Sequence, residues 1–135
     1  MRGYPSGVTP TAVRLLAGAL AVNRTAFGAR YLLQPATAGD SWIGRAARLP
    51  GTQVIVRSQG ARDIALGAGA LAALARRRDG EARAWMAAHA LADGVDTVAT
   101  WAARKRLPQD KARLALAIAG ASTAVAVVSA AGLRG

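Results

Sequence analysis

The stretch LALAIAGASTAVAVVSAAGL, residues 114–133, contains no charged side chain over its whole length. A helix of this length spans about 30 Å, which is the thickness of the hydrocarbon core of a bilayer. The alternative is a buried helix of a soluble bundle, but such helices rarely stay uncharged on every side for so long. The stretch therefore predicts a helix that crosses a membrane.

Three other apolar stretches precede this one, and proline and glycine separate them. The first stretch ends before Pro35, and Pro108 ends the turn that precedes the last stretch. No stretch alternates polar and apolar residues as a strand does. We therefore predict an all-α chain folded as one domain, residues 1–135. Its four long helices are expected at about residues 12–33, 54–75, 82–104 and 110–133.

The segment between the first two helices, residues 34–53, is rich in proline and glycine and is predicted to be a loop. Within it, residues 42–49 are expected to form a short helix at the membrane surface, because Trp42 and two arginines suit the boundary between lipid and water. The later turns are short, so the later helices are expected to pack antiparallel. The predicted fold is a four-helix transmembrane bundle with a short interfacial helix between helices 1 and 2.

The other three long helices are less clearly membrane-spanning. The uncharged part of the second covers only residues 64–75, and the third carries Asp93 and Asp96 near its centre. Each aspartate costs about 2.5–3.5 kcal/mol to insert, so the third helix needs a cationic partner. A soluble four-helix bundle with buried ion pairs is an alternative. A secretory signal peptide with residues 15–22 as its apolar core is another.

Basic residues outnumber acidic ones, with 18 lysines and arginines against 7 aspartates and glutamates and a formal net charge of +11. They cluster in turns, at residues 76–78 and 104–106, and not along one helix face. Such positions favour lipid headgroups, or the positive-inside signal of a multi-pass protein, over nucleic acid. We expect membrane lipids as partners, no nucleic acid, and a multi-pass protein of the inner (plasma) membrane. The basic residues do not set its orientation.

Each apolar stretch holds polar or charged residues near its middle, and in four helices of similar depth these residues would meet. They are Asn23 and Arg24, Arg62 and Asp63, Asp93 and Asp96, and Ser122 and Thr123. Charges inside apolar helices are costly, so they mark either a structural lock or a working site. In a lock, Asp93 is expected to pair with Arg62. Asp96 is expected to pair with Arg24 or another arginine, and Asp63 has Arg24 or Arg57 as candidate partners.

His89, Asp93 and Asp96 are spaced at four and seven residues and therefore share one helix face. They are the candidate catalytic residues, because paired carboxylates and a histidine can exchange protons with a substrate. The candidate ligand-binding or ion-pair residues are Asn23, Arg24, Arg62 and Asp63. A metal site is another interpretation of these residues. It is disfavoured because the chain has a single histidine and nearby arginines would repel a cation. Cysteine is absent, which excludes disulfides and thiolate ligands. We expect no metal and no cofactor.

Two motifs carry a resemblance to a known group of proteins. They are Ser58-Gln-Gly-Ala-Arg-Asp-Ile-Ala-Leu-Gly67 and Ala92-Asp-Gly-Val-Asp96, with a basic turn between them. With them the chain resembles small four-helix integral membrane proteins of bacteria, often actinobacterial, that are DoxX-like in outline and of unknown function. The resemblance covers most of the four helices and implies a four-helix membrane bundle. It implies no activity, and the chain departs from the redox members of that neighbourhood in having no cysteine.

These features lead to two main hypotheses. The first is an accessory or structural membrane subunit, either a homo-oligomer or bound to a membrane protein partner, and locked by ion pairs at mid-depth. The second is a membrane enzyme of the isomerase or hydrolase type, or a lipophile-binding protein, in which His89, Asp93 and Asp96 line a pocket for a lipophilic small molecule. A proton-coupled transporter is a third hypothesis. A pocket beside Asp93 would favour the second hypothesis, and a packed centre with every carboxylate paired would favour the first.

Overall fold

The computed structural model describes residues 9–133, and all of their regular secondary structure is helical. The prediction of an all-α chain is confirmed. Four long helices are accompanied by one short helix and a 3-10 turn. Their bounds are α1 Pro10–Leu33, α2 Pro35–Ile43, η1 Gly44–Arg48, α3 Pro50–Ala75, α4 Asp79–Ala103 and α5 Gln109–Gly132.

Local signals set the helix starts, which lie slightly before the predicted ones. The Thr9 side chain caps α1 by accepting a hydrogen bond from the Ala12 N–H at 3.2 Å. Pro10 follows at the first helical position, where no backbone N–H is needed. Asp79 and Glu81 lie in the first turn of α4, where negative charge suits the helix dipole. The starts of α1 and α4 thus have a local chemical cause.

The prediction of a loop over residues 34–53 is wrong. Pro35 and Pro50 begin helices and do not break them, because proline at the first helical position loses no hydrogen bond. The short helix is α2, which lies earlier than the predicted range of 42–49. Gly44 joins α2 to the 3-10 turn with a φ of 69°, which glycine adopts without strain.

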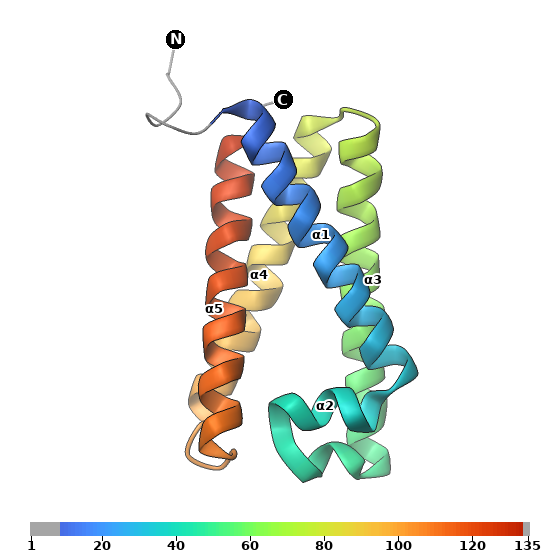
Figure 1. Ribbon diagram of the computed structural model, residues 1–135, viewed down its shortest axis with the longest axis vertical. Helices are drawn as coiled ribbons and strands as arrows, with labels where there is room; N and C mark the ends of the chain where they lie inside the picture. The colour runs from blue at the N-terminus through green and yellow to red at the C-terminus, as the bar shows by residue number, and fades with distance from the viewer. Residues whose placement is uncertain (1–8, 134–135) are drawn as a thin grey trace.

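The long helices form two closely packed pairs, α1 with α3 and α4 with α5 (Figure 1). The pairs meet where α1 begins and α5 ends, and there Val13 covers Gly132 so closely that a Cβ on the glycine would lie 2.7 Å from the valine side chain. From this end the pairs diverge, and α2 lies between their separated ends. The apolar core lies at the end where the two pairs meet. It consists of Val13, Ala17, Ala21, Ala70, Ala73, Ala82, Met86 and Leu133.

Large apolar side chains are exposed on all four long helices. They include Leu15, Leu16, Val22, Val54, Ile55, Leu91, Val95, Val98, Leu114, Ile118, Val127 and Val128. Among the described helices, α5 is the one that is long and apolar enough to cross a membrane by length and composition. Only 11% of its most apolar window is buried, so α5 is not the shielded central helix of a core.

Candidate functional site

Arg24 on α1 is held between two aspartates and away from water. Its Nη1 donates to Asp63 Oδ1 on α3 at 2.8 Å, and its Nη2 forms an ion pair with Asp93 Oδ1 on α4. The side chains of Arg24, Asp63 and Asp93 are only 6%, 9% and 7% exposed. Charges this deep are tolerated when they are paired and hydrogen-bonded to one another. One guanidinium therefore ties three helices together.

Arg62 extends this contact into a longer series of charges. It donates to Asp96 Oδ2 at 2.7 Å and to Asp63 Oδ1 at 3.2 Å. The five groups alternate in sign, and we call them the charge chain. In order, the charge chain is Asp93, Arg24, Asp63, Arg62 and Asp96. The Arg62 side chain is 34% exposed, so this end of the charge chain lies nearer the bundle surface than Arg24.

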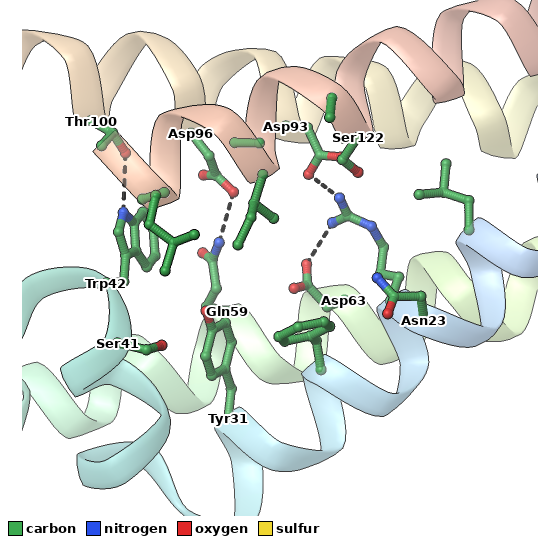
Figure 2. Close-up of a pocket in the computed structure, with 18 of the residues that line it drawn as sticks. Asn23, Tyr31, Ser41, Trp42, Gln59, Asp63, Asp93, Asp96, Thr100 and Ser122 are labelled. Atoms are coloured by element: carbon green, nitrogen blue, oxygen red, sulfur yellow. Dashed lines mark hydrogen bonds and ion pairs between the residues drawn. The ribbon is translucent and has the colours of Figure 1, made fainter. Parts of the chain in front are cut away.

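Neutral donors hold both ends of the charge chain. Ser122 on α5 donates to Asp93 Oδ2, and Gln59 on α3 donates to Asp96 Oδ2 at 2.8 Å (Figure 2). With these two donors, the charge chain links α1, α3, α4 and α5. Ser122 stood out in the sequence as a polar residue in the middle of an apolar helix, whereas Gln59 carried no such signal.

One predicted ion pair is wrong, because Asp93 pairs with Arg24 and not with Arg62. Asp96 takes Arg62, the other arginine. Neighbouring helical residues point about 100° apart. Since Asp63 is buried, the neighbouring Arg62 points in another direction from α3 and reaches the more exposed Asp96 of α4. The prediction that Asp63 takes Arg24 or Arg57 is confirmed for Arg24.

His89 is not part of the charge chain, although it shares a helix face with Asp93. It is fully buried, and neither ring nitrogen has a hydrogen-bond partner within residues 9–133. The backbone of Leu66 lies near the ring but outside normal hydrogen-bond geometry. The three residues predicted to share one helix face therefore have different surroundings. His89 is buried, whereas Asp93 and Asp96 line a cavity.

A cavity of about 580 Å³ lies beside the charge chain, where the two helix pairs diverge (Figure 2). This volume is within the range of about 300–1,000 Å³ that is usual for small-molecule sites. Arg24, Asp63, Asp93 and Asp96 contribute the charged wall. The neutral polar lining includes Asn23, Tyr31, Ser41, Gln59 and Thr100, and the apolar lining includes Leu20, Phe27, Leu114, Ile118 and Val125. A charged wall and an apolar wall thus face one space.

Helix α2 closes the cavity at the diverging end of the bundle. Trp42 lines the cavity, and its Nε1 donates to Thr100 Oγ1 at 3.1 Å, while its place at a membrane surface stays a prediction. Lys111 at the start of α5 donates to Asp40 Oδ2 at 2.9 Å. This hydrogen bond holds the pKa of Asp40 below its ordinary value. Two polar contacts therefore dock α2 on α4 and α5.

Comparisons of the chain with family models, curated proteins and solved structures found no match. The resemblance to DoxX-like membrane proteins stays a prediction, and no residue role comes from a relative. Within residues 9–133, no three His, Cys, Asp or Glu side chains are grouped so as to hold a metal ion. What the structure shows at the site is a set of buried, paired charges beside an apolar space.

Proposed function

We propose that this is a multi-pass membrane protein that binds a lipophilic small molecule in the cavity beside the charge chain. The observation that carries the proposal is the cavity itself, which has Asp93 and Asp96 on one wall and apolar side chains of α5 on another. Ion pairs alone are enough for a structural lock. A ligand site also needs accessible space, and this space adjoins the pairs.

The surface of the bundle supports its placement in a bilayer. Large apolar side chains are exposed on every long helix, whereas the helices of a soluble bundle keep a polar face toward water. The two basic turns, residues 76–78 and 104–106, lie at opposite ends of α4. With 25 residues, α4 is about 37 Å long, which is enough to separate the two headgroup regions of a bilayer.

In this placement the charge chain lies at mid-depth, since Asp93 and Asp96 are near the middle of α4. Charges at this depth are expected to face protein and to pair with one another. Arg24, Asp63 and Asp93 do so, and their burial fits a bilayer better than it fits water. The apolar exterior and the paired interior support the same placement.

The exposure of the lining residues supports entry from the side. Phe27 of α1 and Leu114 and Ile118 of α5 line the cavity and are also exposed. These two helices diverge toward α2 (Figure 1), and residues of both line the cavity, so the expected entrance lies between them. A lipophile dissolved in the hydrocarbon core can therefore enter without passing through water.

An accessory structural subunit is the second candidate function. The observation in its favour is that each aspartate of the charge chain has an arginine partner. Acid–base catalysis has less support, because His89 lies outside the cavity lining and Asp93 and Asp96 are already engaged in ion pairs.

Cavity filling tests the proposed function. Ala119 lines the cavity, whereas Ala117 on the same helix is exposed and does not. The protein is purified from membranes in mild detergent, and bound lipophiles are extracted and identified by mass spectrometry. We expect a stoichiometric lipophile with the unaltered protein and with Ala117→Phe, and its loss with Ala119→Phe. Equal recovery from the two variants, or no lipophile from the unaltered protein, would contradict the proposal.

A further inference from the structure

The charge chain contains one more negative charge than positive charge, although each of its aspartates contacts an arginine. Its two guanidinium groups face three carboxylates, so its net charge is −1. A buried net charge is energetically unfavourable, so one additional positive charge would stabilise the site.

The described residues do not supply this positive charge. Arg57 is exposed and makes no ion pair within residues 9–133, and the buried His89 makes none either. Arg30 lines the cavity rim, but its side chain is exposed and it is not paired with a carboxylate in the described part of the chain. The cavity lining from α5 contains no charged residue, and that from α2 consists of Ser41 and Trp42.

The unpartnered acceptor faces the cavity. Asp63 Oδ1 accepts from both arginines, whereas no hydrogen bond to Asp63 Oδ2 is found within residues 9–133. Asp63 lines the cavity although its side chain is more than nine-tenths buried. Asp96 of α4 lines the same cavity from the opposite helix pair (Figure 2). A positive group placed in the cavity would therefore meet two carboxylates.

The rest of the lining suits a cation that carries apolar groups. Phe27, Tyr31 and Trp42 line the same space, and aromatic faces attract organic cations. Leu114, Ile118 and Val125 offer an apolar surface on the opposite side. Such a ligand would be a hydrophobic amine or a quaternary ammonium or phosphonium ion, because a strongly hydrated ion gains little from these walls.

We propose that the cavity binds a lipophilic cation in exchange for a proton. This inference rests on the proposed lipophile-binding function and names its ligand class. Without ligand, one carboxylate of the charge chain carries a proton, which makes the set neutral. When a permanent cation binds, that carboxyl releases its proton to solvent, and the carboxylate and the cation remain together. One positive charge leaves and one enters, so the charge of the site is conserved.

Two probes of the same shape and opposite charge test the inference, namely tetraphenylphosphonium and tetraphenylborate. Calorimetric titration of the full chain in lipid nanodiscs should show binding of the phosphonium and release of about one proton. The released proton is measured from the difference in binding enthalpy between buffers of unequal ionisation enthalpy. Affinity for the phosphonium should rise with pH by at most about tenfold per unit where the proton competes. Tetraphenylborate should bind at least tenfold more weakly.

Two variants separate the effect of charge from loss of folding. Asp96→Asn removes the surplus negative charge of the charge chain, so it should stay folded, lose at least tenfold in phosphonium affinity and release no proton. Arg30→Gln removes a positive charge from the rim and should bind the phosphonium more tightly. Glu81→Gln is the control and should match the unaltered protein, because Glu81 is exposed in the first turn of α4 and does not line the cavity.

Equal or tighter binding of tetraphenylborate, or binding of the phosphonium without proton release, would overturn the exchange. So would a gain in affinity with Asp96→Asn. In each of these cases a lipophile that co-purifies and is lost with Ala119→Phe would still support the proposed function. If no lipophile co-purifies and neither probe binds, both proposals fail.

Discussion

Gly28 on α1 and Gly60 on α3 approach so closely that a Cβ on either would lie 2.6 Å from the backbone carbonyl oxygen of the other. Small residues allow helices to approach to this degree. The contact lies toward the diverging end of the bundle and holds α1 against α3. At this end α1 and α5 diverge (Figure 1), and residues of both helices line the cavity.

Enlarging either glycine should therefore force the helices apart. We expect Gly60→Ala to lower the free energy of unfolding by about 1–3 kcal/mol, because the methyl group meets backbone atoms that have no room to move. Gly18 on α1 has no atom within 4 Å of an added Cβ, so Gly18→Ala is the control and should be neutral or slightly stabilising. Thermal unfolding in detergent measures both variants. Equal melting temperatures for the two variants would show that the close contact is not formed.

Arg24 should be the residue whose loss costs the most stability. Arg24→Gln leaves Asp63 and Asp93 buried without a shared cation, and breaking a buried pair in this way typically costs about 3–5 kcal/mol. Adding Asp93→Asn removes one of the two stranded charges and should recover part of the loss. The exposed Arg57→Gln is the control, with an expected change within about 0.5 kcal/mol.

A double-mutant cycle in detergent, followed by thermal or denaturant unfolding, gives the coupling between Arg24 and Asp93 directly. If Arg24→Gln behaved like Arg57→Gln, or if the losses from Arg24→Gln and Asp93→Asn simply added, the charge chain would not be a buried unit.

The contact between Asp40 and Lys111 should respond to acid. The pKa of Asp40 is lowered in the folded protein, first by the hydrogen bond from Lys111, so the contact adds stability above the unfolded-state pKa. That contribution is lost as the pH falls through the lower, folded-state value. Lys111→Met should raise the pKa of Asp40 toward its ordinary value, whereas Arg113→Met on the same helix should leave it in place. Carbon-detected NMR titration of the Asp40 carboxyl measures this pKa. An unchanged titration in Lys111→Met would contradict the docking of α2 on α5.

The sequence was sufficient for the long helices, because apolar stretches bounded by proline and charged turns leave few other choices. It was not sufficient for α2. In the sequence alone, Pro35 and Pro50 indicate a loop, and only the three-dimensional context shows that they occupy first helical positions. Proline alone does not distinguish the end of one helix from the start of the next.

The members of the charge chain were recognisable as costly residues in apolar helices, but their pairing was not. Which arginine reaches Asp93 depends on how far each helix is rotated about its axis, and a helix with apolar residues on all sides gives no clear signal of that rotation. The cavity could not be predicted from the sequence either. It depends on how α1 packs on α3, and the sequence does not show that Gly28 and Gly60, among many glycines, form the close contact.

Placement of four helices across a bilayer is the claim on which the account depends, and cysteine labelling tests it directly because the natural chain has no cysteine. Single cysteines are introduced as Arg77→Cys, Val95→Cys and Lys105→Cys, and intact cells and inside-out vesicles are treated with a maleimide that does not cross membranes. We predict that Arg77→Cys and Lys105→Cys react from opposite sides. Val95→Cys, exposed in the middle of α4, should react from neither side. Labelling of Arg77→Cys and Lys105→Cys from the same side, or full reactivity of Val95→Cys in a protein that remains in the aqueous fraction, would contradict the account.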